Sequence, residues 1–143
     1  MSYVKIMVHA VWRTKNNVPY LTKEIRTAVI EHIKQNARTK EIFIDAIDGH
    51  TEHLHCLMGL NAEMSISKAM MLIKGESAFW INKQKLTKSK FEWADEYFAV
   101  SVSESMLDKV RGYIEGQEEH HKKVTLAQEY DEFMSKYGFM VQG

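Results

Sequence analysis

Two histidines that share one face of an expected β-strand, His53 and His55, are the first residues of this chain whose spacing favours chemistry. They lie in the apolar run GHTEHLHCLMGL, residues 49–60. Side chains alternate between the two faces of a strand, so both imidazoles would lie on one face, roughly 7 Å apart. Two imidazoles at that spacing can converge on one metal ion. A pair of half-exposed strand histidines without a ligand explains these residues equally well.

A second polar group lies in the segment VRGYIEGQEEHH. If this segment is a helix, Tyr113 and Gln117 are neighbours one turn apart. His120 and His121 continue the same stripe, which taken alone fits a solvated surface. Together with the histidine pair, however, the amide oxygen of Gln117 would complete a mixed nitrogen and oxygen site suited to a divalent ion. A tyrosine one turn from that amide is a candidate covalent nucleophile.

The elements that must position these residues are indicated by the hydrophobic pattern. It predicts strands at 3–13, 41–48, 51–60 and 97–103, a helix at 23–38 and a helix that begins near 65. A third helix, expected from Ser103 or Ser105 to about residue 121, carries the tyrosine. A capping box formed by Thr125 and Gln128 begins a last helix, which ends at Gly138.

The order β-α-β-β-α-β is that of the split βαβ pattern. It predicts an α+β fold, a ferredoxin-like or RRM-like sandwich whose four-stranded, mostly antiparallel sheet carries two helices on one face. The tyrosine-bearing helix is a C-terminal addition to that sandwich. Because no linker or internal repeat divides the 143 residues, we expect a single domain spanning 1–143.

Composition narrows the class of protein. Lys and Arg total 19, as do Asp and Glu, and this balance argues weakly against a protein wrapped in nucleic acid. Cys56 is the single cysteine, so no intrachain disulfide can form, which fits a reducing cytoplasm. No apolar run approaches the roughly 18 residues of a membrane span, and the N-terminus is typical of a strand rather than a signal peptide.

The sequence resembles the single-tyrosine HUH transposases of the insertion-sequence 200/605 family, in which HUH denotes His, hydrophobic residue, His. The motif HLH is followed in the family's order by IKG, SVS and YIEGQ. The segments HAVWRTKNNVPYL and KKVTLAQEYDEFMSKYGF also match, so the resemblance covers almost the whole chain. Glu52 departs from the pattern, because Asp or Asn is commoner before the first histidine.

The resemblance implies metal-assisted cleavage and rejoining of DNA strands. His53, His55 and Gln117 would hold Mg²⁺ or Mn²⁺, and either His120 or His121 remains open as a replacement for Gln117. The Tyr113 oxygen would attack the scissile phosphate and form a 5′-phosphotyrosine link, without a nucleotide cofactor.

The resemblance also implies partners. The substrate would be single-stranded DNA folded into a hairpin at the ends of the element, and the protein would be a homodimer in which each tyrosine helix can reach the partner's histidine pair. Action in a bacterial cytoplasm, at the nucleoid, and no association with a membrane are expected. The candidate DNA-binding residues are Arg13, Lys74, Lys83 and Lys85 for phosphate, and Trp80 and Trp93 for base stacking.

Two alternatives to a mobile-element transposase remain open. The same chemistry would serve a domesticated nuclease-ligase that acts on chromosomal hairpins, and only the DNA flanking the gene separates the two. A non-catalytic nucleic-acid-binding module on the same fold is disfavoured, because sheet-type RNA binders display aromatic residues where this chain displays histidines. A structural zinc site is weaker still, because such sites prefer four Cys or His ligands.

Overall fold

The computed structural model describes residues 1–139, which form one four-stranded sheet with helices on both faces. The strands are β1 (Ile6–Thr14), β2 (Phe43–Gly49), β3 (His53–Leu60) and β4 (Trp93–Ser101). The helices are α1 (Lys23–Thr39), α2 (Ile66–Lys83), α3 (Leu107–Glu115), α4 (Gln117–His120) and α5 (Leu126–Lys136). Short 3-10 helices lie at Lys15–Asn17 and Glu104–Met106. The strand order is β2-β3-β1-β4, and each neighbouring pair is antiparallel.

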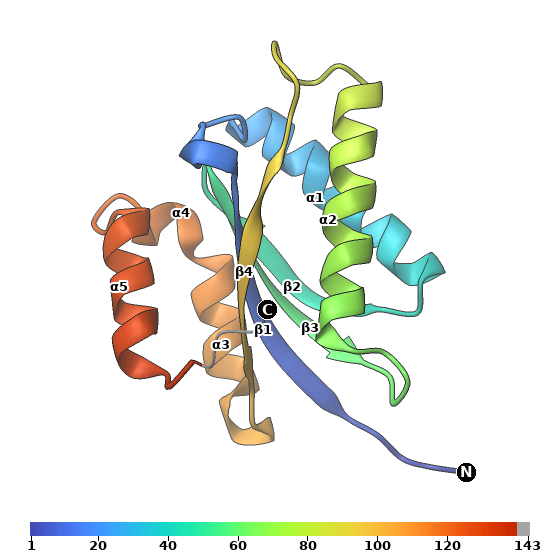
Figure 1. Cartoon of the computed structure of the whole chain (residues 1–143). Coiled ribbons are helices and arrows are strands. Elements are labelled where there is room, and N and C mark those ends of the chain that lie inside the picture. Colours follow the sequence, from blue (N-terminus) through green and yellow to red (C-terminus); the bar gives the residue numbers. More distant parts are fainter. Residues whose placement is uncertain (140–143) are drawn as a thin grey trace.

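The larger core lies between the sheet and the helices α1 and α2, which cover the same face (Figure 1). In α1 the buried residues Val29, Ile33 and Ala37 recur every fourth position, which places them on one stripe of the helix. From β3, Leu54 and Cys56 point into this core and are fully buried. Burial of these apolar side chains fixes which face of β3 is turned toward α1 and α2.

A second, smaller core lies on the opposite face, where α3 packs against the sheet. It contains Met7 of β1, Leu57 of β3, and Leu107 and Ile114 of α3. Because side chains alternate along a strand, the histidines of β3 share the face of Leu57 rather than that of the larger core. The helix that bears the tyrosine is therefore held directly over the histidine pair.

The turn from β2 to β3 leads directly into His53, the first residue of β3. Its backbone closes tightly, since the His50 amide donates a hydrogen bond to the His53 carbonyl oxygen at 3.0 Å. A Cβ atom on Gly49 would lie 2.0 Å from that same oxygen. Glycine is therefore required here by the close approach of two backbone segments.

The structure confirms the predicted fold class and element order, with two corrections. The fourth strand begins at Trp93 rather than at residue 97, because after an irregularity in the β1–β4 ladder Thr14 pairs with Trp93. The helix expected to continue to about residue 121 is interrupted at Gly116, which separates α3 from α4. Glycine weakens a helix interior by roughly 1 kcal/mol relative to alanine, which favours an interruption at this position. Across residues 1–139 no helix has the length and apolar character that crossing a membrane requires.

Candidate active site

The two histidines of β3 are completely buried, and each is oriented by a hydrogen bond through its Nδ1 atom. Nδ1 of His53 lies 2.8 Å from a carboxylate oxygen of Glu52, the residue that departs from the family pattern. Nδ1 of His55 lies 2.9 Å from Nε2 of His9 on the neighbouring strand β1. These contacts leave both Nε2 atoms facing the same space beneath α3, α4 and α5.

Gln117 brings an amide oxygen to this space. Its Oε1 atom lies 3.2 Å from Nε2 of His53, and its Nε2 group donates a 3.3 Å hydrogen bond to the Tyr113 carbonyl oxygen. The second bond fixes the orientation of the amide, so that the oxygen rather than the nitrogen faces the histidine. Gln117 is fully buried, as expected for a side chain that belongs to the site rather than to a solvated stripe.

Glu129 of α5 is an unexpected member of the cluster. Its carboxylate is 1% exposed, and Oε1 lies 2.9 Å from Nε2 of His55 and 3.4 Å from Nε2 of His53. The same oxygen lies 3.4 Å from Nε2 of His121. Three imidazoles thus surround one carboxylate oxygen in the interior of the protein.

These residues fit a divalent cation. One donor atom each from His53, His55, His121 and Glu129 lie within 4.8 Å of one another. Within residues 1–139, the buried Nε2 atom of His121 has no hydrogen-bond partner, although buried polar atoms are normally paired. A metal ion would satisfy this atom, and a set of imidazole, carboxylate and amide donors suits divalent ions such as Mn²⁺.

Tyr113 lies beside the histidines of its own chain. Its hydroxyl donates a hydrogen bond to Oε2 of Glu129, and its ring centroid is 5.5 Å from that of His55 in an edge-on arrangement. Nε2 of His120 is 3.5 Å from the tyrosine oxygen. The structure therefore brings the tyrosine, the histidine pair and the glutamine of the sequence prediction into one site.

The electrostatics of the cluster follow from burial and from the central carboxylate. Burial acts to lower the pKa of His53, but hydrogen bonds to Glu129 and Glu52 outweigh it and raise that pKa to about 9. Burial lowers the pKa of His55 to about 4, and the charge of Glu129 only partly opposes this. Burial also acts to raise the pKa of Glu129, yet the facing imidazoles hold that pKa well below its usual range. Burial and then the bond to Glu129 raise the pKa of Tyr113, so its hydroxyl is protonated at neutral pH.

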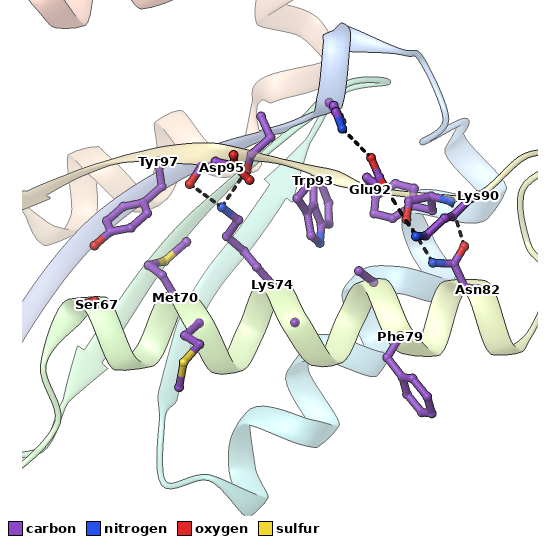
Figure 2. A pocket seen from close by; sticks show the side chains of 16 residues that line it. Ser67, Met70, Lys74, Phe79, Asn82, Lys90, Glu92, Trp93, Asp95 and Tyr97 are labelled. Atoms are coloured by element: carbon purple, nitrogen blue, oxygen red, sulfur yellow. Dashed lines mark hydrogen bonds and ion pairs between the residues drawn. The ribbon is translucent and has the colours of Figure 1, made fainter. Parts of the chain in front are cut away.

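Two of the four residues predicted to contact phosphate are engaged inside the chain. Nε of Arg13 donates a 2.8 Å hydrogen bond to Glu96 of β4. The ammonium group of Lys74 reaches from α2 toward β4 and donates to the carbonyl oxygens of Ala94 and Asp95 at 2.7 and 3.1 Å (Figure 2). Lys74 thereby spans a groove of about 750 Å³ between α2 and β4.

The other predicted contact residues lie on or near α2, the helix on the face of the sheet opposite the histidines. Lys83 and Lys85 are exposed at the end of α2 and just beyond it. Both tryptophans make contacts inside the protein: Trp93 is 7% exposed and donates to the Ser77 hydroxyl, and Trp80 stacks on His32. A direct contact of these residues with DNA stays a prediction.

Sequence reasoning missed two members of the site, Glu129 and His9. Glu129 stands within the acidic stretch QEYDE, which is typical of a solvated helix face, and nothing in its spacing indicates that α5 folds back over the sheet. The role of His9 could have been predicted from the alternation of β1, since His9 lies on the face opposite Val8 and Ala10. In the antiparallel pairing of β1 and β3 that face also carries His55.

Comparison with known proteins gives consistent results. Residues 2–117 match the family model for IS200-like transposases, so that the part of the chain containing His121 and Glu129 lies beyond the matched region. The transposase of insertion sequence IS200 from Salmonella typhimurium is 25% identical over 132 residues, covering 82% of this chain and 86% of that protein. The corresponding transposase of Salmonella typhi matches equally well.

Two solved structures share the fold. A presumed transposase from Deinococcus radiodurans superposes with a TM-score of 0.66 at 24% identity, over 82% of this chain and 95% of its own. A REP-associated tyrosine transposase, solved bound to a REP hairpin, superposes with a TM-score of 0.65 at 17% identity, over 87% of this chain and 73% of its own. The open antiparallel sheet with its flanking helices is thus shared with these two proteins.

Proposed function

This chain belongs to the family of IS200-like transposases, and on that premise we propose that it cleaves and rejoins single-stranded DNA with Tyr113 as the nucleophile. The observation that carries the proposal is the convergence of Tyr113 with His53, His55 and Gln117 beneath α3. These residues come from two distant parts of the sequence, and a purely structural role would not require a tyrosine hydroxyl beside buried imidazoles.

His53, His55 and Gln117 would hold the metal ion, through the two imidazole Nε2 atoms and the amide oxygen. When bound, a divalent ion would grip a non-bridging oxygen of the scissile phosphate and offset the negative charge that develops there. Mg²⁺ and Mn²⁺ both suit phosphate chemistry, and the nitrogen-rich donor set favours Mn²⁺ of the two. Glu52 and His9 would keep the imidazoles in the orientation that ligation needs.

The chemical step conserves ester bonds. The Tyr113 oxygen forms a bond to phosphorus while the bond from phosphorus to the 3′ oxygen breaks. The tyrosine loses its proton, and the leaving 3′ oxygen gains one. The resulting 5′-phosphotyrosine retains the free energy of the phosphodiester, so the 3′ hydroxyl of another strand can reverse the step without a nucleotide cofactor.

We propose a hairpin in single-stranded DNA as the substrate, acted on in the cytoplasm at the nucleoid. The REP-associated relative was solved with such a hairpin, which supports this substrate class. Single-strand binding proteins combine cationic contacts to the backbone with stacking of bases. Exposed Lys83 and Lys85 are available for backbone contacts at one end of the molecule.

Replacement of the nucleophile tests the proposal. Tyr113→Phe removes one oxygen atom and little volume, so it should abolish the covalent protein–DNA adduct in denaturing gels while hairpin binding stays near wild type. Tyr97→Phe is the matched control, because it makes the same change at a tyrosine on β4 and should leave adduct formation intact. An adduct of normal yield from the Tyr113 variant would move the nucleophile elsewhere, with Tyr130 next to be tested.

Removal of the ion tests the metal role. Adduct formation should stop in excess EDTA and return when Mn²⁺ or Mg²⁺ is added back. Gln117→Ala should raise the concentration of added Mn²⁺ that restores the adduct, since it deletes one proposed ligand. Undiminished cleavage in EDTA would reject the metal, and full activity of the Gln117 variant would favour His121 as the third protein ligand.

We further propose that the protein is a homodimer. β4 is an edge strand of the sheet, and an edge strand presents unpaired backbone groups to which a second chain can add. The contact of Tyr113 with His55 of its own chain supports sites built within one subunit. A mixture of Tyr113→Phe and His55→Ala chains should therefore remain inactive after verified subunit exchange, whereas recovered cleavage would mean that each site combines residues of both subunits.

A further inference from the structure

The proposed site is closed to solvent in the structure, although its substrate is a DNA strand. His53, His55 and Gln117 are fully buried, and Glu129 is 1% exposed. The helix α5 lies over the histidine face of the sheet and supplies Glu129 (Figure 1). A phosphate can reach the imidazoles only after this helix has moved.

Glu129 occupies the position that a scissile phosphate needs. One carboxylate oxygen accepts the hydrogen bond of the Tyr113 hydroxyl, and the other lies 2.9 Å from Nε2 of His55. The carboxylate therefore bridges the nucleophile and the proposed ion site. For attack to occur, the phosphate must lie between these same groups, with its phosphorus roughly 3–3.5 Å from the tyrosine oxygen.

We propose that Glu129 is a further ligand of the metal ion in the DNA-free protein, and that the DNA phosphate must displace it before cleavage. The inference rests on the proposed function, since it assumes that the histidine cluster holds an ion. A carboxylate resembles a phosphate in presenting two anionic oxygens on one atom, so it can ligate the ion with one and accept a hydrogen bond with the other. Glu129 thereby keeps the ion in place and holds Tyr113 away from reaction.

The construction of α5 suits such a displacement. The helix is a capped unit, because the Thr125 side chain accepts from the Gln128 amide and the Gln128 side chain accepts from the Thr125 amide. Its ring contacts to the sheet are few: Tyr130 packs on Phe98, and Phe133 lies near the histidines of β1 and β3.

The packing between α5 and α3 is incomplete. A cavity of about 190 Å³ lies between α3 and α5, lined in part by Tyr113, Glu129 and Phe133. Within the described residues, no side chain of α5 belongs to the larger core beneath α1 and α2. The helix can therefore leave the site without disturbing that core.

Metal binding without DNA provides the first test. Free Mn²⁺ is measured by electron paramagnetic resonance during titration of the full-length protein, for wild type, Glu129→Gln and Glu132→Gln. Loss of a partner in the outer shell of a metal site already costs about 10–100-fold in affinity, so loss of a direct carboxylate ligand should weaken Mn²⁺ binding at least tenfold. Glu132→Gln is the matched control, because it makes the same change on an exposed position of the same helix and should leave affinity unchanged. Unchanged affinity of the Glu129 variant would overturn the proposal.

Rescue by inorganic phosphate provides the second test. In Glu129→Gln the position of the carboxylate is neutral, so millimolar phosphate should restore Mn²⁺ affinity toward the wild-type value. In wild type the carboxylate already fills this position, and phosphate should change the affinity little. Weakened binding that phosphate restores no better than in wild type would show that Glu129 does not stand in for the phosphate, and would overturn the displacement.

A different role for Glu129 gives a different pattern. If the carboxylate served only as the proton acceptor of Tyr113, Glu129→Gln would lower adduct formation and leave Mn²⁺ affinity as in wild type, which rejects the proposal. Should the Gln variant fail to fold by circular dichroism, Glu129→Asp keeps the charge but withdraws it from the ion by one methylene, so Mn²⁺ affinity should again fall at least tenfold, and unchanged affinity would overturn the proposal. Both tests omit DNA, so they are independent of the adduct assay on Tyr113 that decides the proposed function.

Discussion

His9 should control both the stability of the fold and the affinity of the histidine pair for metal. It is 5% exposed, and its Nε2 atom lies 2.9 Å from Nδ1 of His55. Without metal, Nε2 of His55 donates to Glu129 at 2.9 Å, so Nδ1 accepts from His9. When an ion takes Nε2, the His55 proton must reside on Nδ1 and be donated to His9. The imidazole of His9 can take either role, because its Nε2 atom donates in one tautomer and accepts in the other, whereas a phenyl ring can take neither.

His9→Phe keeps a ring of similar size and removes the hydrogen-bonding partner. A buried polar group left without a partner costs about 1–3 kcal/mol, so the free energy of unfolding in urea, measured in EDTA, should fall by about that amount. Mn²⁺ affinity, measured by calorimetry, should fall about 10–100-fold, because the ion polarises the Nδ1–H group and makes its partner more important. Burial, and then the charge of His55, lowers the pKa of His9 to about 3, so His9 is neutral near pH 7 and able to accept this bond.

The matched control for His9 is His32→Phe. His32 pairs with Glu76 between α1 and α2, on the other face of the sheet, and its replacement should leave Mn²⁺ affinity unchanged. Wild-type Mn²⁺ affinity in His9→Phe would refute the reasoning, since it would mean that His55 needs no second hydrogen bond to bind metal. Equal losses in both variants would point to a general loosening of the fold rather than to the contact between the two imidazoles.

Three further outcomes are expected. Gly49→Ala should lower the free energy of unfolding by about 1–3 kcal/mol in urea titrations, because the added Cβ would lie 2.0 Å from the His53 carbonyl oxygen; an unchanged midpoint would contradict this. Thr125→Ala should remove about 1 kcal/mol from the start of α5 and speed amide hydrogen exchange across that helix about fivefold, with no change in the strands. Arg111→Met should lower the free energy of unfolding at pH 7, and the difference from wild type should shrink below about pH 4. Hydrogen bonds from Arg111 lower the pKa of Asp45 in the folded protein. Their stabilisation is therefore present above the pKa that Asp45 has in the unfolded chain, and it is lost as acid protonates the carboxylate. A difference independent of pH would refute the last expectation.

The fold could be predicted from the sequence because apolar residues alternate clearly in the strands and recur about every fourth position in the helices. The alternation in residues 51–60 predicted that His53 and His55 share one face of a strand, and in the structure they share the face that packs against α3, while Leu54 and Cys56 pack in the larger core. The start of β4 was harder to predict, because Trp93 ends the polar, Lys-rich stretch KQKLTKSKFEW, which is typical of a loop. The pairing of Trp93 with Thr14 depends on tertiary contacts, namely the edge-on packing of the Trp93 ring against Trp12 and its hydrogen bond to the Ser77 hydroxyl.

Site residues could be predicted from the sequence only where their spacing matches the repeat of the strand or helix that carries them. The histidine pair and the step from Tyr113 to Gln117 follow from periods of 2 and 3.6, and the structure brings all four residues together. Glu129 did not follow, since a local pattern predicts a helix but not where that helix lies. Placing α5 requires the path of the chain after Gly116, which is set by contacts between residues far apart in the sequence.

The order of the elements along the chain also has a kinetic consequence. The central strand β1 pairs with β4 in a register that joins Val8 to Ser101, and every proposed catalytic contact to the histidine pair comes from residues that follow β4. Contacts between residues far apart in the sequence form slowly, because closing the long loop between them costs conformational entropy. Since chains fold from the N-terminus as they are synthesised, the histidine pair is present in the nascent protein before Tyr113, the proposed nucleophile, has been made. Under the proposed function, a newly made polypeptide would therefore be unable to cut DNA until translation has carried the chain past Tyr113 and α3 has docked on the completed sheet.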